Sequence, residues 1–144
     1  MTTVHKTFPP LLLAKYPHMF KGDIRIWEKF LKKFPKLYNF VQYDIKVGSG
    51  TKPIEGQTDA YRKMQEILSK YRIDAVGTRD DQTDIIEDKP QASTIAIGQT
   101  LAYVRLYVRD YEPTQSVIPT IITDYEVPDM RYLTRVLSVQ YYVV

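Results

Sequence analysis

Two apolar segments separated by a short polar turn carry the acidic and basic side chains that are best suited to chemistry. The first segment, residues 72–77, contains Asp74, and the second, residues 85–90, contains Glu87 and Lys89. Two strand-like segments on either side of a turn rich in aspartate predict a β-hairpin. The hairpin would bring an acid from one strand close to an acid and a lysine from the next.

The position of the turn decides which side chains of this hairpin oppose each other. If Asp80 and Asp81 form a two-residue turn, Asp74 pairs with Glu87, because each lies six residues from the turn. Directly opposed residues have Cβ atoms about 4.5–5.5 Å apart, so the two carboxylates would repel each other. A divalent cation turns this repulsion into coordination, since hard cations prefer oxygen ligands. Lys89 shares a strand face with Glu87, and this arrangement predicts cleavage of a phosphodiester bond.

Length and composition indicate one globular domain. The chain has 144 residues, which is long enough for a single core of about five strands and a few helices. No apolar run approaches the roughly 20 residues that span a bilayer, so we expect no membrane partner. The absence of cysteine excludes disulfides and thiolate metal sites. A cytoplasmic or virion location is the simplest expectation for such a chain. A net charge of +3 permits a nucleic-acid partner without requiring one.

The order of helices and strands expected from hydrophobic spacing indicates an α/β fold. Residues 1–22 form an irregular lead-in, and residues 23–144 form a single domain whose first helix Asp23 can cap. Besides the hairpin, the spacing predicts helices over 23–34, 93–109 and 128–137, and strands over 40–47, 117–123 and 139–144. Residues 48–60 read as a polar loop, and residues 61–70 fit either a short helix or an early start of the next strand. We expect a three-layer α/β core with a mixed central sheet flanked by helices, including one parallel strand pair.

With this order of elements, the acids and the lysine resemble the PD-(D/E)XK nuclease superfamily, which has the restriction-endonuclease-like fold. That family places an Asp on one core strand and Glu-x-Lys on the next, within an α-β-β-β-α-β core. Asp74 matches the Asp, and Glu87-Asp88-Lys89 matches Glu-x-Lys. Ile73 stands where the name-giving motif has proline. The resemblance implies a restriction-endonuclease-like core.

The resemblance extends to other positions within residues 23–144. Gln99 and Tyr103, on the helix after the hairpin, resemble the Gln-x-x-x-Tyr element of the branch typified by RecB-type exonucleases. Family members often add a carboxylate from the first helix as a further metal contact, and Glu28 is the candidate for it here. The alternative reading of Gln99 and Tyr103 is a pair of side chains that satisfy hydrogen bonds in the core, and that of Glu28 is part of a solvated helix face.

The resemblance implies a metal-dependent mechanism. Asp74 and Glu87, helped by Glu28 and the backbone carbonyl of Asp88, would bind Mg²⁺ or Mn²⁺. Lys89 would orient or deprotonate the attacking water, or stabilise charge on the phosphoryl oxygens. The simpler alternative is a salt-bridged strand face in which Asp74 pairs with Lys89.

Two other charged pairs deserve comparison with the hairpin. Arg105 and Arg109 form a basic stripe on the same predicted helix as Gln99, and are either a phosphate contact or a solvated face. Asp44 and Lys46 also lie two residues apart on a predicted strand. They lack a second carboxylate strand of their own, so they rank below the hairpin as a catalytic site.

Taken together, the residues and the resemblance predict a metal-dependent nuclease that acts on DNA. The alternative is a nuclease-fold structural or DNA-binding component of a phage particle or DNA-handling complex, with little or no catalysis. Homo-oligomerisation or docking onto a larger assembly is compatible with either function, and an RNA substrate is a weaker third reading.

Overall fold

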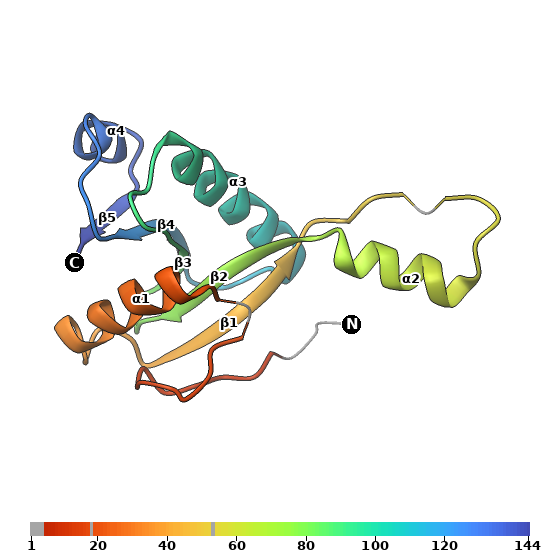
Figure 1. The fold of residues 1–144 in the computed structure, drawn as a ribbon, viewed down its shortest axis with the longest axis horizontal. Coiled ribbons are helices and arrows are strands. Elements are labelled where there is room, and N and C mark those ends of the chain that lie inside the picture. The colour runs from red at the N-terminus through yellow and green to blue at the C-terminus, as the bar shows by residue number, and fades with distance from the viewer. Residues whose placement is uncertain (1–4, 18, 53) are drawn as a thin grey trace.

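The computed structural model describes residues 5–17, 19–52 and 54–144, and within these ranges it contains four helices and a five-stranded sheet (Figure 1). The elements, in chain order, are α1 (Lys21–Lys33), β1 (Phe40–Val47), α2 (Asp59–Leu68), β2 (Tyr71–Thr78), β3 (Gln82–Asp88), α3 (Thr94–Tyr111), β4 (Ser116–Thr123), α4 (Met130–Val136) and β5 (Gln140–Val143). The predicted α/β fold with a mixed central sheet flanked by helices is confirmed.

The sheet follows the order β1-β2-β3-β4-β5. The first three strands are antiparallel neighbours, whereas β4 runs parallel to β3 and β5 runs parallel to β4. The predicted two-residue turn is present, because Thr78 pairs with Thr83 and the backbone N–H of Arg79 donates to the carbonyl of Gln82 at 2.9 Å. The predicted parallel pair is β4 and β5.

Three layers result from the way the helices cover the sheet. Trp27 and Phe30 of α1 pack with Ile86 of β3 on one face. Tyr103 and Val104 of α3 pack on the other face, and α4 lies against the same helix. The alternation of side chains along β3 therefore separates two cores, one on each side of the sheet.

The alternation of side chains between the two faces of the sheet is broken at the level of Asp74 and Asp44. Tyr43 and Ile45 of β1 should share a face because they lie two residues apart, yet Tyr43 packs in the core beside α1 and Ile45 in the core beside α3. Asp44, between them, has φ of 54°, a left-handed conformation that breaks the regular alternation of side chains within β1. Asp74, on β2, lies opposite Asp44, between the register pairs Tyr43–Ala75 and Ile45–Ile73.

Two expectations about local structure need correction. The prediction that Asp23 caps the first helix is wrong, because α1 begins at Lys21, its N-cap position is Phe20, and Asp23 is buried in the first turn. The ambiguous segment 61–70 is mostly helical, and α2 begins two residues inside the segment expected to be a loop. Thr58 caps α2 by accepting a hydrogen bond from the backbone N–H of Tyr61.

Gly77 on β2 is a position where a side chain does not fit. A Cβ atom there would lie 2.5–2.7 Å from ring atoms of Tyr38, which is held in place because its hydroxyl donates to the fully buried carboxylate of Asp84 at 2.7 Å. We expect Gly77→Ala to lower the free energy of unfolding by about 1–3 kcal/mol, as overpacking does in other cores. Urea denaturation at neutral pH measures this loss.

Gly98→Ala is the matched control. A Cβ atom at Gly98, in α3, meets no heavy atom within 4 Å. Alanine is more favourable than glycine inside a helix, so the free energy of unfolding of this variant should rise by about 0.5–1 kcal/mol. A Gly77→Ala protein as stable as the wild type would contradict the tight packing of Tyr38 against β2.

Candidate active site

The hairpin brings its two predicted carboxylates together. β2 and β3 pair Ala75 with Ile86, and the next step along the ladder sets Asp74 opposite Glu87. Asp74 Oδ2 accepts a hydrogen bond from the backbone N–H of Asp88 at 3.0 Å, which fixes the carboxylate against β3. The predicted opposition of the two acids therefore follows from the observed register.

Lys89 lies directly beyond the end of β3 and reaches back over these acids. Its Nζ atom is 3.6 Å from Asp74 Oδ2 and 3.8 Å from Asp23 Oδ2. Its backbone N–H donates to the carbonyl of Ile122 on β4 at 3.0 Å, so the start of the side chain is anchored to the sheet. The lysine thus bridges an acid of the hairpin and an acid of α1.

Asp23 is the helix-borne carboxylate of this site, a role expected of Glu28. Five residues separate the two, which is about 140° around a helix, so they face different directions. Glu28 instead lies near Tyr16, whose pKa is raised mainly by burial and also by the charge of Glu28. Asp23 shares the buried stripe of α1 with Ile26 and Trp27. The missed signal was an acid at the i, i+3, i+4 spacing of an apolar face.

Glu87 and its neighbour Asp88 have buried carboxylate oxygens that accept no hydrogen bond. Glu87 is 2 % exposed and Asp88 is 0 % exposed. Glu87 Oε1 and both carboxylate oxygens of Asp88 have no hydrogen-bond partner. Unpartnered buried polar groups destabilise a fold, so carboxylates in this state indicate that the site serves something other than stability.

Burial and neighbouring like charges shift the pKa values of the buried acids upward, toward the protonated form. Burial raises the pKa of Glu87 to about 9, with a further contribution from the charge of Asp74. Burial likewise raises the pKa of Asp88, well above its usual range, and that of Asp74, which Lys89 partly counteracts. Burial disfavours the Lys89 ammonium, but the charges of Asp74 and Asp23 outweigh it and raise its pKa.

These acids match the ligand set of a cation that needs few protein ligands. In the part of the chain that the structure describes, no group of three or more His, Asp or Glu side chains has the spacing to enclose a metal ion. Mg²⁺ is commonly bound by one or two carboxylates together with waters and substrate phosphates. Asp74 and Glu87, the latter with an unpartnered buried oxygen, fit that requirement.

Gln99 and Tyr103 both lie close to these charged groups. Tyr103 is 8 % exposed, and after burial the charges of Glu87 and Asp74 contribute most to raising its pKa. Gln99 and Lys89 line the same cavity of about 280 Å³ at the start of α3. The structure therefore brings both polar residues of this predicted pair to the candidate site.

The predicted basic stripe does not join them. Arg105 lies two residues after Tyr103, about 200° further around α3, and both Arg105 and Arg109 are exposed. Arg109 Nε donates to Asp110 Oδ1 at 2.8 Å. A phosphate contact by this stripe would have to occur away from the carboxylates.

The competing acid–lysine pair on β1 has a structural explanation. Arg72 on β2 donates from Nε and Nη2 to the two carboxylate oxygens of Asp44, at 2.8 and 2.9 Å. This bidentate pair joins the two strands at the irregularity beside Asp74, so Asp44 stabilises the hairpin.

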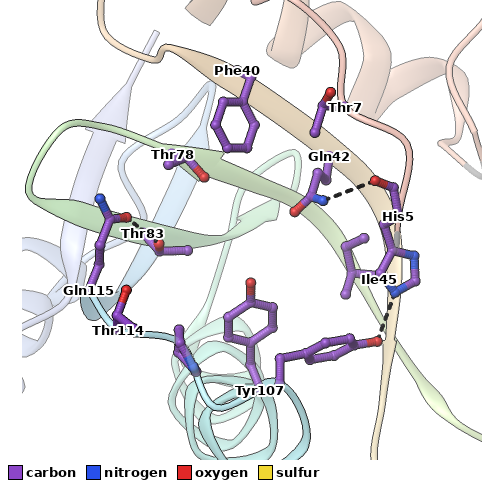
Figure 2. A pocket seen from close by; sticks show the side chains of 12 residues that line it. His5, Thr7, Phe40, Gln42, Ile45, Thr78, Thr83, Tyr107, Thr114 and Gln115 are labelled. Atoms are coloured by element: carbon purple, nitrogen blue, oxygen red, sulfur yellow. Dashed lines mark hydrogen bonds between the residues drawn. The ribbon is translucent and has the colours of Figure 1, made fainter. Parts of the chain in front are cut away.

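A larger cavity, of about 600 Å³, lies elsewhere on the α3 face of the sheet (Figure 2). Its lining residues carry no carboxylate, lysine or arginine side chain. Figure 2 shows Gln42 bonded to the backbone of His5, Thr83 bonded to Gln115, and Tyr107 directed toward the space between them. Thr83 precedes Glu87 by four residues on β3, which places it about 13 Å from Glu87. The cavity is therefore separate from the candidate site.

Comparisons with known proteins found no relative. No family model, no curated protein and no solved structure matches this chain. Separately, none of the helices within the described ranges has the length and apolar character to cross a membrane.

Proposed function

We propose that this protein is a metal-dependent nuclease that hydrolyses phosphodiester bonds of DNA. The observation that carries the proposal is the convergence of Asp74, Glu87 and Lys89 at the end of a hairpin, where a buried oxygen of Glu87 has no partner. Buried acids whose pKa values are strongly shifted beside a specific charge partner are typical of a functional site.

The order of the elements supports the same proposal. Apart from the inserted α2, the chain runs α1, β1, β2, β3, α3 and β4, which is the α-β-β-β-α-β order of the PD-(D/E)XK core. The acid of β2 and the Glu-x-Lys at the end of β3 occupy the corresponding strands. The fold alone does not specify an activity, so the proposal rests on these side chains.

Each residue has a defined role in the proposed reaction. Asp74 and Glu87 would hold Mg²⁺ or Mn²⁺, and Asp23, whose Oδ2 lies 3.8 Å from Lys89 Nζ, would help to position that lysine. The bound ion would supply Lewis acidity and a lowered pKa for an attacking water. Lys89 would orient that water or stabilise charge that develops on the phosphoryl oxygens.

The surrounding side chains would support this chemistry. Gln99 shares a cavity with Lys89 and would brace the lysine or contact the nucleic-acid backbone. Tyr103 would hold its neutral hydroxyl beside the carboxylates, since its pKa is raised. Arg105 and Arg109 remain candidates for phosphate contacts outside the centre of the site.

The direct test is cleavage of single-stranded, duplex and branched DNA in Mg²⁺ or Mn²⁺, and again with a chelator. We expect cleavage that the chelator abolishes, and Asp74→Asn should lower the rate by about 10²-fold or more, because it removes a charged ligand. Mn²⁺ affinity, measured calorimetrically, should fall at least about tenfold in the same variant.

Asp81→Asn is the matched control, since Asp81 is an exposed acid in the turn of the same hairpin. Its cleavage rate and Mn²⁺ affinity should equal those of the wild type. Cleavage that survives Asp74→Asn would mean that the site is elsewhere. No cleavage of any substrate by folded protein would favour the alternative function, a structural or DNA-binding component of a phage particle or DNA-handling complex.

A further inference from the structure

The larger cavity lies where α3 stops covering the sheet (Figure 2). Tyr103 of α3 packs on the sheet, but the helix ends at Tyr111. The segment after it continues to the turn of the hairpin, where Gln115 Nε2 donates to the carbonyls of Arg79 and Asp80 at 3.1 and 3.0 Å. The space that remains, about 600 Å³, has the size of a small-molecule site. We call it the α3-end cavity.

The strands that line the α3-end cavity carry polar side chains where a core would carry apolar ones. Thr78 lies two residues after Val76, so both share a face of β2. Thr83 lies two residues before Ile85, so both share a face of β3. Gln42 pairs with Val76 across the sheet. Core-facing strand positions are normally apolar, so this change to threonine and glutamine indicates that the end of the sheet contacts hydrogen-bonding groups.

The α3-end cavity is uncharged at neutral pH. Its titratable lining residues are His5, Tyr107 and Tyr111. Burial, followed by the charge of Lys46, lowers the pKa of His5, and burial raises the pKa of both tyrosines, so all three are neutral at pH 7. A phosphate, carboxylate or ammonium group would find no counter-charge here. The cavity therefore suits an uncharged ligand.

Aromatic rings form the side of the cavity that belongs to α3. The ring centroids of Tyr107 and Tyr111 lie 4.9 Å apart, with the ring planes tilted by 31°. Tyr111 is fixed in place, since its hydroxyl donates to the carbonyl of Lys46 at 2.7 Å and lies 2.9 Å from His5 Nε2. Tyr107 directs its hydroxyl into the cavity (Figure 2), where no residue that the structure describes forms a hydrogen bond with it. A ring and an available hydroxyl thus face the same space.

We propose that the α3-end cavity binds an unpaired nucleobase, which packs against the tyrosine rings while the strands contact its edge. A base is uncharged, flat, apolar on its faces and polar only at its edge. Stacking on aromatic side chains is a common way in which proteins hold unpaired bases. The proposal does not depend on the nuclease assignment, since the cavity is separate from the carboxylates.

Gln42 is the side chain best suited to contact the edge of a base. Its Nε2 atom is 3.4 Å from the carbonyl of His5, a long hydrogen bond, and its Oε1 accepts none from the residues that the structure describes. Gln115 differs, because its Oε1 accepts from Thr83 at 3.0 Å and its Nε2 donates to two backbone carbonyls. A glutamine amide can pair through both atoms with adenine, at N6 and N7. We therefore expect adenine to bind more tightly than the other bases.

A sugar is another uncharged ligand of this size, but the lining favours a base. Hydroxyls surround a sugar ring, so a sugar needs polar partners around its whole edge. The side chains that α3 contributes are Tyr107 and Tyr111, whereas the glutamines and threonines come from the strands and from the segments on either side. This division matches a base, whose faces and edge differ in polarity.

Chemical-shift mapping with adenosine, guanosine, cytidine and thymidine tests the proposal. For a ligand of about 20 non-hydrogen atoms, ordinary ligand efficiency gives adenosine a dissociation constant of about 10–100 μM. The shifts should concentrate on Gln42, Thr78 and Tyr107, and the other nucleosides should bind at least about threefold more weakly. No shift of these residues by any nucleoside at about 5 mM, or tighter binding of a methyl glucoside, would overturn the proposal.

Gln42→Met tests the role of the amide, because methionine keeps the length of the side chain without its hydrogen-bonding groups. Adenosine affinity should fall at least about tenfold with an unchanged melting temperature. Gln57→Met is the matched control, since Gln57 is exposed in the loop before α2 and should leave the affinity unchanged. Equal adenosine affinity in Gln42→Met and the wild type would contradict the proposed contact.

Competition with nucleic acid identifies the source of the base. A short single strand of deoxyadenosines that displaces adenosine would assign the cavity to an unpaired base of a strand, whereas a strand that does not would assign it to free nucleosides. A duplex of the same sequence should not compete, because its bases are paired and stacked. A duplex that competes as well as the single strand would overturn the requirement for an unpaired base.

Discussion

Lys89→Ala is expected to lower the rate of DNA cleavage by about 10²–10³-fold, with little change in DNA affinity. The Lys89 ammonium is 3.6 Å from Asp74 and 3.8 Å from Asp23, longer than a tight ion pair. Its side chain is 36 % exposed, so it remains accessible to a substrate. A cation held beside the acids but not locked to them is suited to act on a phosphoryl group in the transition state, and removing it should lower kcat.

Metal affinity separates this role from simple disruption of the site. Lys89 repels a divalent cation, so Lys89→Ala should bind Mn²⁺ as tightly as the wild type or a few-fold more tightly. A misfolded site would bind it more weakly. The wild type and the variant can be compared by calorimetric Mn²⁺ titration and by single-turnover cleavage.

Lys46→Ala is the matched control, because Lys46 also follows an acid by two residues on a strand, but that acid is held by Arg72. Its cleavage rate should equal that of the wild type. Equal cleavage by Lys89→Ala and the wild type would remove Lys89 from the proposed mechanism.

The hairpin could be predicted from the sequence because the interactions that define it are local. A two-residue turn at Asp80 and Asp81 fixes the register, and the register sets Asp74 opposite Glu87 whatever the rest of the fold. The layer architecture followed from the order of apolar segments. Both predictions needed only spacing along the chain and the alternation of side chains in a strand.

The helix-borne acid could not be placed in the same way. Asp23 has the residue type and position of a cap, and only the packing of α1 against β3 shows that its carboxylate points to Lys89. The change of face at Asp74 also depends on a distant residue, since Asp44 on β1 adopts a positive φ. Helical spacing could have placed Asp23 on the apolar face of α1, but only tertiary contacts show which side chain it meets and where the strands change their alternation.

The orientation of α2 is a further case in which the usual rule gives the wrong answer. Helical spacing of Tyr61, Met64 and Leu68 would normally indicate a buried stripe. In the structure these side chains are exposed, because Gly50 and Ser69 fix the opposite side of α2 against the loop. A sequence shows that a stripe exists but not which surface covers it.

Glu87→Gln is expected to stabilise the metal-free protein at neutral and alkaline pH. Burial raises the pKa of Glu87 from 4.5 to about 9, so the folded protein holds a proton that the unfolded chain releases. The stability that Glu87 contributes is complete below its unfolded pKa and falls as pH rises through this window, by up to about 1.4 kcal/mol per pH unit. Glutamine does not titrate, so folding of the variant involves no proton uptake at this position. The variant should therefore be more stable than the wild type by up to about 3 kcal/mol at pH 7.

The sign of the pH dependence is the decisive observation. Urea denaturation in a chelator, from about pH 5 to about pH 8, should show the stability of the wild type falling more steeply than that of Glu87→Gln, by about one proton. Glu112→Gln, at an exposed acid that ends α3, should keep the wild-type slope. Added Mg²⁺ should stabilise the wild type and have little effect on Glu87→Gln, because a cation favours the ionised carboxylate that the variant cannot form. Equal slopes for the wild type and the variant would mean that Glu87 is already ionised in the folded protein. In that case, the absence of a partner for its buried oxygen would no longer indicate a site that a metal completes.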